Sequence, residues 1–336
     1  MEIAMALYLT EDDVRQVLDM PLAIAAVEDA HRALSEGRAQ DLPRQRTRTP
    51  KLALHLLQAS YTDQAGASVT GFKAYTSSRS GNRFLVHLYD GVTGALLAMI
   101  TADRLGMMRT GAASGVASRW LANPHAHELA LFGTGWQAEG HLAAQLTVLP
   151  IAKVSVIGRN AEKRDAFVKR MRQRFPDRLF VSVAPEEAAS AVATANVVGT
   201  ITTSSSPVLE TAWVSPGTHI NAAGSNALIR RELSEDLIRK ASPVVVDTVE
   251  TALAEAGDLL PLLEKGRLLP RQLIELGDVI TRRVPVTFNP DGMSVFESQG
   301  LGVQDLAVAL NVLARAREQG LGTELPIAFA ADAAMR

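Results

Sequence analysis

Residues 129–138 read Leu-Ala-Leu-Phe-Gly-Thr-Gly-Trp-Gln-Ala, and this stretch decides the fold. It places Gly133, Gly135 and Ala138 in a G-x-G-x-x-A pattern between an apolar strand and a helical segment. The first glycine permits a tight turn, the second lets the backbone approach a pyrophosphate, and the small third residue lets the helix pack on the strand. Because a second strand follows at Lys153, we interpret the stretch as a dinucleotide-binding turn rather than a glycine-rich turn of another α/β fold.

Strands and helices alternate after this turn. The strand candidates are 128–133, 153–158, 179–183, 196–202, 218–223 and 243–247, and helical patterns lie between most of them. This rhythm predicts a Rossmann-type, doubly wound parallel sheet.

The residues before the turn have a different pattern. Strand candidates lie at 7–9, 52–57, 68–75, 84–90 and 95–100, with turn signals between them. A helix rich in small residues is predicted over 102–122, and a last long helix over 303–319 is expected to pack back on this part. The fold class is therefore α/β, with a smaller α+β domain beside the Rossmann-type sheet.

Composition excludes several classes of protein. The chain has 336 residues, with 34 basic and 36 acidic side chains and no cysteine. The absence of cysteine rules out disulfides, cysteine-based metal sites and thiol nucleophiles. The nearly balanced charge provides no overall positive potential that would attract nucleic acid or an anionic membrane. The pair His125 and His127 lacks a third ligand nearby in the sequence, so no metal is expected. The N-terminus lacks a basic region before its first carboxylates, which predicts a cytoplasmic protein.

The end of the second strand points to the cofactor. Enzymes that use NAD place an acidic residue there, whereas this chain reads Gly158-Arg159-Asn160, with Lys163 following. A cation at this place suits a 2′-phosphate, so NADP(H) is predicted, with NAD(H) as a possible cofactor. The alternative is an ordinary solvated and basic start of a helix.

Two cations lie among apolar neighbours in the first domain. Lys73 lies in a strand candidate, and Arg109 lies in the helix of small residues. A cation in such a setting needs an anion. That anion is either a substrate carboxylate, with Arg46 as a third donor, or a structural partner such as Asp90 or Asp103, and spacing alone leaves both open.

Taken together, the motifs resemble the ornithine cyclodeaminase/mu-crystallin family, in order and over nearly the whole chain. The segments that carry the resemblance are Gly71-Phe-Lys73, the run 105–114, the glycine turn, the run 219–226, the pairs Glu255 to Asp258 and Glu275 to Asp278, and the run 296–305. The resemblance implies a homodimer. It assigns 1–122 with 303–336 to substrate binding and dimerisation, and 123–302 to NAD(P) binding.

The resemblance also implies roles for individual residues. Lys73, Arg109 and one of Arg44, Arg46 and Arg48 would hold the substrate carboxylate, and Arg46 fits the family pattern best. Lys73 and Arg109, together with Asn226, form the predicted catalytic set. The predicted cofactor contacts are Thr110, Gly133, Gly135, Trp136, Gln137, Ala138, Arg159, Asn160, Thr202, Ala222 and Arg230.

One position departs from the family's cyclodeaminases, which carry an aspartate two residues after the glycine that matches Gly224. Here the residue is Asn226, whose amide cannot act as the acid or base that ammonia loss needs. This favours NADPH-dependent reduction of a cyclic or N-substituted imino acid, such as pyrroline-2-carboxylate or piperideine-2-carboxylate, to the L-amino acid. Two alternatives stay open. One is a lyase of the family, either ornithine cyclodeaminase or cis-3-hydroxyproline dehydratase. The other is a non-catalytic nucleotide-dependent ligand-binding protein.

Overall fold

The computed structural model describes residues 5–327 and divides into two compact units. The first unit runs to Arg109 and resumes at Leu301, and the second is Thr110–Gly300. The domain limits expected from the sequence stay a prediction, and positions 1–4 and 328–336 of the expected first domain lie outside the described residues. The N-terminal segment that predicts a cytoplasmic location also begins with these residues 1–4, which lie outside the described part of the chain.

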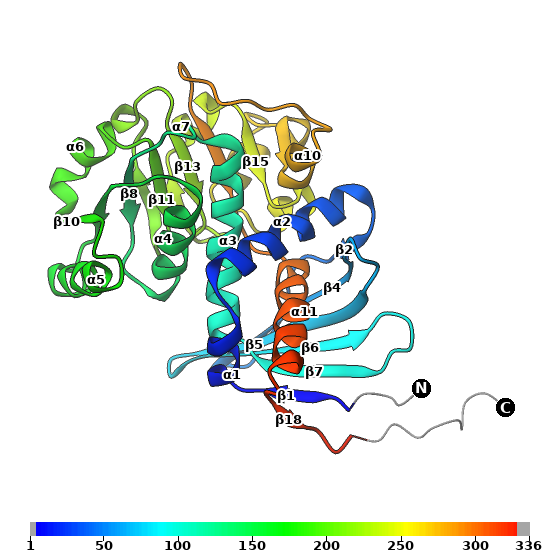
Figure 1. The fold of residues 1–336 in the computed structure, drawn as a ribbon. Helices are drawn as coiled ribbons and strands as arrows, with labels where there is room; N and C mark the ends of the chain where they lie inside the picture. The colour runs from blue at the N-terminus through cyan, green and yellow to red at the C-terminus, as the bar shows by residue number, and fades with distance from the viewer. Residues whose placement is uncertain (1–4, 328–336) are drawn as a thin grey trace. The chain divides into compact units, whose positions relative to one another are not determined.

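The first unit is built on a largely antiparallel sheet with the strand order β18-β1-β7-β6-β5-β4-β2, and β3 also pairs with β4 (Figure 1). The strands are β1 (Leu7–Leu9), β2 (Ala39–Asp41), β3 (Gln45–Arg48), β4 (Leu52–Thr62), β5 (Ser68–Ser78), β6 (Gly81–Asp90), β7 (Leu96–Thr101) and β18 (Thr323–Glu324). The strands predicted at 7–9, 52–57, 68–75, 84–90 and 95–100 are all present, with longer limits for three of them.

Helices α1 (Glu11–Val17), α2 (Met20–Glu36) and α11 (Gly302–Glu318) accompany this sheet. Thr10 and Asp13 form the capping box of α1. Asp19 caps the start of α2, and Gly37 ends it with a φ of 77° that suits glycine. Helix α11 packs on α2 and on the strands β4 and β5, so the last helix returns to the first unit as predicted.

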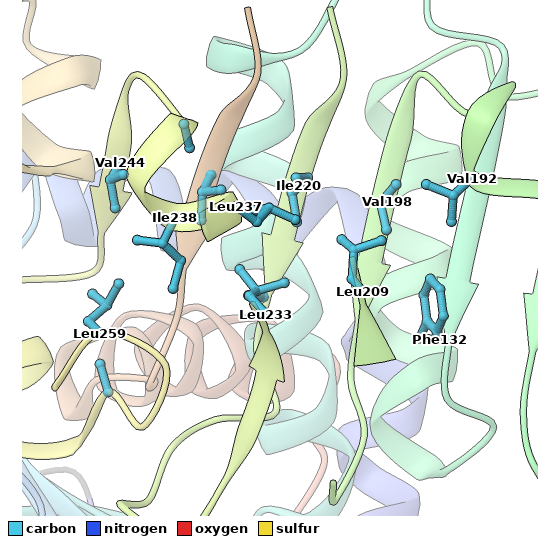
Figure 2. Close-up of a cluster of buried hydrophobic side chains, with 14 of the residues drawn as sticks. Phe132, Val192, Val198, Leu209, Ile220, Leu233, Leu237, Ile238, Val244 and Leu259 are labelled. Atoms are coloured by element: carbon cyan, nitrogen blue, oxygen red, sulfur yellow. The ribbon is translucent and has the colours of Figure 1, made fainter. Parts of the chain in front are cut away.

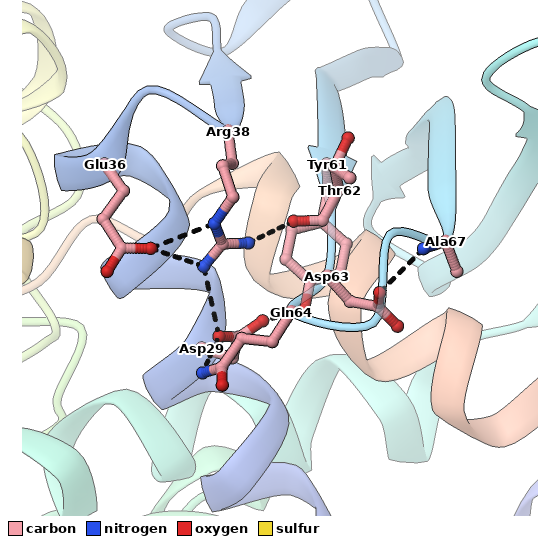
Figure 3. Close-up of polar contacts among 8 residues, drawn as sticks. All are labelled: Asp29, Glu36, Arg38, Tyr61, Thr62, Asp63, Gln64 and Ala67. Atoms are coloured by element: carbon pink, nitrogen blue, oxygen red, sulfur yellow. Dashed lines mark hydrogen bonds and ion pairs between the residues drawn. The ribbon is translucent and has the colours of Figure 1, made fainter.

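A polar network fastens the end of α2 to β4 (Figure 3). The Tyr61 hydroxyl and the Gln64 amide donate to the two oxygens of Asp29, at 2.5 and 2.7 Å. Arg38 donates to Glu36 at 2.8 Å and to the carbonyl of Thr62. Burial, then the contact with Asp29, raises the pKa of Tyr61, so this hydroxyl stays a donor. The network therefore fixes helix α2 against strand β4 and the turn that follows it.

The second unit contains the predicted doubly wound sheet, in which all eight strands are parallel. Their order is β10-β9-β8-β11-β13-β17-β15-β16. The strands are β8 (Glu128–Phe132), β9 (Lys153–Ile157), β10 (Leu179–Val183), β11 (Val197–Thr200), β13 (His219–Ala222), β15 (Val244–Val246), β16 (Leu273–Glu275) and β17 (Ser294–Glu297). The order reverses between β8 and β11, and ligands of such sheets bind in the crevice at this switch point.

Short helices and a small two-stranded sheet complete the second unit. The helices are α4 (Trp136–Val148), α5 (Ala161–Arg174), α6 (Ala188–Ala193), α7 (Glu235–Lys240), α8 (Val249–Glu255), α9 (Leu260–Glu264) and α10 (Leu276–Ile280). Strands β12 (Ser205–Leu209) and β14 (Arg231–Leu233) pair with each other. Helix α3 (Asp103–Leu121), predicted over 102–122, contains both Arg109 and Thr110.

One hydrophobic cluster in the core of the second unit consists mainly of aliphatic side chains, with Phe132 among them (Figure 2). Val198 and Ile220, from the neighbouring central strands β11 and β13, are both fully buried, and Leu237 of α7 packs with them. Fully burying one such side chain contributes about 1.5–3 kcal/mol. This rigid cluster holds the strand ends from which the crevice is built. In the described part of the chain, no helix is long and apolar enough to cross a membrane.

Candidate active site

The glycine turn lies where strand β8 ends. Gly133 has a φ of 119°, and a Cβ placed there would lie 2.5 Å from the carbonyl oxygen of Ile201, so only glycine fits. Gly135 is the N-cap of α4 and places no side chain over the end of the helix. Ala138 is fully buried against the strands. These are the three roles predicted from the pattern, and they leave the backbone open to a pyrophosphate at the start of α4.

A cavity of about 570 Å³ opens at this turn. Its lining comes from the ends of β8 and β9, from the segment after β11, and from Pro185, Ala188 and Trp213. Five predicted cofactor residues line it: Gly133, Gly135, Arg159, Asn160 and Thr202. The concave shape, the glycine turn and the mixed apolar and polar walls fit a nicotinamide dinucleotide.

The other predicted cofactor residues lie outside this lining. Trp136 is 52% exposed at the start of α4, and Ala222 is buried at the end of β13. Arg230 donates from Nη1 to the carbonyl of Thr203, which lines the cavity. Three further predicted cofactor contacts also do not line the cavity: Thr110, Gln137 and Ala138.

The end of the cavity near β9 is basic. Arg159 and Lys163 line it and are exposed, and no acidic residue is in the lining. The side chain of Asn160 caps α5 by accepting from the Lys163 N–H at 2.8 Å. Arg164 is engaged in the fold, because it donates to Ser182 and to the carbonyl of Gly158, both at 2.7 Å. Arg159 and Lys163 are therefore the cations that this wall offers to a phosphate.

The first unit brings Lys73 and Arg109 together on one carboxylate. Lys73, on β5, lies 2.7 Å from Oδ2 of Asp305, and Arg109 donates from Nε to Oδ1 at 2.9 Å. All three side chains are buried. The prediction of Asp90 or Asp103 as the structural partner was wrong, because both cations pair with Asp305 of α11.

The network extends from Arg109 to two further residues that sequence reasoning missed. Arg109 donates from Nη1 to Oε1 of Gln304 at 2.9 Å. The Gln304 amide nitrogen lies 3.0 Å from Nε2 of His31, a fully buried side chain on α2. The contact with His31 therefore fixes which way the Gln304 amide faces. Asp305 and Gln304 end the motif 296–305 that carried the family resemblance, and this was the available signal.

Charge at this cluster favours an additional anion. Two cations share one carboxylate, so the cluster carries excess positive charge when all three groups are ionised. Burial, and next the positive charge of Arg109, lower the pKa of Lys73 to about 7, although Asp305 acts in the opposite direction. An incoming carboxylate would hold Lys73 in its charged form, because an opposite charge at close range favours ionisation.

The arginines of strand β3 lie on the same sheet. Arg46 is paired with His55 of β4, which is paired with Tyr75 of β5, and the rings of His55 and Tyr75 stack at 4.3 Å. Burial, followed by Arg44, Arg46 and Arg48, lowers the pKa of His55 to about 4, so the imidazole is neutral at pH 7. Since Lys73 is two residues from Tyr75 on β5, Arg46 and Lys73 lie on the same face of the sheet. The contact between Arg46 and a substrate stays a prediction.

Asn226 lies in the second unit, on the segment that follows β13, and is half-buried. Its neighbour Ser225 donates to Glu297, a buried carboxyl whose pKa is raised well above its usual range by burial and by Asp258. Asp258 itself accepts backbone N–H groups of β14, and Asp247 accepts those of Gln299 and Gly300. These two aspartates therefore have structural contacts with the backbone.

Comparison with known proteins gives the family. The model of the ornithine cyclodeaminase/mu-crystallin family matches residues 5–320. The chain belongs to this family. A Δ1-pyrroline-2-carboxylate reductase of Bacillus cereus is 36% identical over 242 residues, which cover 72% of this chain and 73% of that protein.

Solved structures of the family agree with the fold. The Δ1-pyrroline-2-carboxylate reductase of Thermococcus litoralis, in complex with NADH and L-proline, matches with a TM-score of 0.87 and 27% identity, covering 95% of this chain and 100% of that one. An archaeal alanine dehydrogenase dimer with bound NAD matches with a TM-score of 0.88 and 28% identity, covering 96% and 99%.

Proposed function

We propose that the chain is an NADPH-dependent reductase that converts a cyclic or N-substituted imino acid into the L-amino acid. The observation that carries this is the buried cluster in which Lys73 and Arg109 share the single carboxylate of Asp305. It offers positive charge to a second carboxylate in a unit that also contains the arginines of β3. The dinucleotide cavity and the relatives that are pyrroline-2-carboxylate reductases support the same reaction.

The residues act mainly by binding and orienting. A bound nicotinamide supplies the hydride that an imine carbon accepts. Arg109, held by Asp305 and Gln304, presents its donors in a fixed plane, and Lys73 adds a point charge beside it. With Arg46 as the third donor, the carboxylate is held in one orientation, and such positioning provides much of the rate. The imine binds already protonated from solvent, so the chain needs no general acid for this step.

A panel of substrates tests the function directly. The enzyme is mixed with NADPH and pyrroline-2-carboxylate, piperideine-2-carboxylate, or pyruvate with methylamine, and absorbance is followed at the nicotinamide band. We expect NADPH consumption that matches the amount of amino acid formed. Tight ligand binding without turnover on any of them would instead support the non-catalytic binding protein, and keto-acid release from cis-3-hydroxyproline would support the dehydratase.

We expect NADPH to be preferred over NADH, because Arg159 and Lys163 line the end of the cavity and no acidic residue does. Replacing Arg159 by alanine should narrow the ratio of the two kcat/KM values by roughly 10- to 100-fold, since it removes a charge-assisted contact of about 1.5–3 kcal/mol. Arg164→Ala is an unsuitable control because Arg164 holds the fold, so Lys169→Ala on the outer part of α5 serves instead. Equal use of both nucleotides by the unaltered enzyme would contradict the assignment.

We expect no cyclisation of ornithine to proline, because Asn226 can only donate and accept hydrogen bonds as a neutral group. Ammonia release from ornithine, measured with catalytic amounts of nucleotide, should therefore be absent. Asn226→Asp should weaken imine reduction by adding a charge, and weak deamination could be sought in the same variant. Robust ammonia release from ornithine by the unaltered protein would restore the cyclodeaminase reading.

A homodimer is part of the proposal. It is supported by the resemblance of this chain to the archaeal alanine dehydrogenase, which is a dimer. Light scattering should give about twice the monomer mass of 36.0 kDa. The location in the cytoplasm stays a prediction.

A further inference from the structure

The strands β11 and β13 separate at the edge where the cavity opens. They pair from Val197 and His219 up to Thr200 and Ala222, and the last ladder bond runs from the Ala223 N–H to the carbonyl of Thr200, at 3.0 Å. Beyond this point, no further ladder hydrogen bond joins the ends of the two strands within the described residues. Thr202 goes on to line the dinucleotide cavity.

Where the ladder has ended, the side chain of Glu232 lies between the two strand ends and accepts their backbone N–H groups. Its Oε1 accepts the Thr202 N–H at 2.5 Å, and its Oε2 accepts the Gly224 N–H at 2.7 Å. The carboxyl group is completely buried and reaches this place from strand β14. Burial raises its pKa to about 7, while the bonds from the Thr202 and Gly224 N–H groups act in the opposite direction and favour the carboxylate. A buried backbone N–H without an acceptor is costly, so both strand ends depend on this one side chain.

Two further contacts show that Glu232 has a fixed position. Its own N–H donates to Oδ1 of Asp258 at 2.8 Å, which anchors β14 at this residue. On the other side, Gly224 lies so close that an added Cβ would be 2.5 Å from the Glu232 carboxyl group. The glycine thus leaves the space that the Glu232 carboxyl group occupies between the strand ends.

We propose that Glu232 is a positioning residue for the nucleotide: by bonding the Thr202 and Gly224 N–H groups, it holds the ends of β11 and β13 apart in the shape that the cofactor requires. It acts through Thr202, which lines the cavity, and does not itself line it. This inference rests on the proposed use of NADPH.

Glu232→Gln tests the proposal. The glutamine oxygen can accept one N–H, but its NH2 group must then face the other donor, so one buried N–H loses its acceptor. We expect NADPH affinity, measured by the fluorescence of the bound nicotinamide, to weaken on the order of ten-fold. The KM for NADPH should rise in parallel, while the KM for pyrroline-2-carboxylate at saturating NADPH stays as in the unaltered enzyme.

Asp247→Asn is the matched control. Asp247 is also a buried carboxylate of the second unit and accepts two backbone N–H groups at 2.8 Å, but on residues 299 and 300, which do not line the cavity. Its variant should lose thermal stability and keep its NADPH affinity. If Glu232→Gln fails to fold, Gly224→Ala perturbs the same contact from the other side and should weaken NADPH binding in the same way.

The outcomes separate this inference from the proposed function. If the unaltered protein binds no NADPH, the proposed function fails. If it binds NADPH and the Glu232 variant binds it equally well, or if both buried-carboxylate variants weaken it alike, the positioning role is overturned. Weakening confined to Glu232→Gln or Gly224→Ala, with the substrate KM unchanged, supports it.

Discussion

Replacing Arg109 by methionine is expected to lower kcat/KM for the imino acid by about 10²–10³-fold. Arg109 is buried and donates to Asp305 and Gln304, so its guanidinium is already held in the plane that a carboxylate recognises. Truncating one partner of a buried, hydrogen-bonded charge pair costs about 2–5 kcal/mol, or roughly 30- to 5,000-fold, and the expected loss lies in the middle of this range. Methionine keeps the length and apolar volume, so the loss reports the charge and its donors.

The measurement that separates binding from folding is the comparison of three quantities. Steady-state kinetics with the imino acid should show the large loss, NADPH affinity should change much less, and Lys73→Met should behave like Arg109→Met. The structural reading of the two cations makes the opposite prediction. Under that reading, both variants would keep their kinetic constants and lose only melting temperature.

The turn at Gly133 shows why the second unit could be predicted from the sequence. Its pattern is local: two glycines, a small residue and an apolar strand lie within ten consecutive positions, and each meets a steric demand of the backbone. Strand β8 could be predicted as well, because a parallel strand buried on both faces is a continuous apolar run, here residues 129–132. Strands β12, β14, β16 and β17 were not predicted, because three to five residues with mixed polarity carry no periodic signal.

The candidate site was only partly predictable, because its essential contacts are remote in sequence. Lys73 and Arg109 could be singled out by their apolar surroundings, yet Asp305, which holds both, is more than 190 positions away along the chain. Spacing therefore suggested the nearer aspartates, and the correct partner required the return of α11 to the first unit. Glu232 was missed for a similar reason: its carboxylate acts on backbone N–H groups, and no sequence pattern marks those.

Replacing Asp305 by asparagine is expected to reduce the free energy of unfolding by about 3–5 kcal/mol, the cost of leaving buried charge uncompensated. Asp305 is fully buried and lies 2.7 Å from the Lys73 ammonium and 2.9 Å from Arg109. Asparagine has nearly the same shape but no charge, and its amide nitrogen is a donor facing donors. Chemical denaturation followed by circular dichroism measures the change, and Asp236→Asn is the control, because Asp236 lies equally close to Lys240 on an exposed face and should show little effect.

A double variant then identifies the cause of the loss. If the penalty comes from unpaired cations, Lys73→Met in the Asp305→Asn background removes one of them and should restore part of the stability, although each change alone destabilises. If Asp305 contributed only packing, the two losses would add. Because the bound carboxylate of a substrate would take over the role of Asp305 for the same cations, the single variant should also gain more thermal stability from a carboxylate ligand such as L-proline than the unaltered enzyme does. Equal ligand-induced shifts in both proteins would show that the cluster does not bind the substrate's carboxylate.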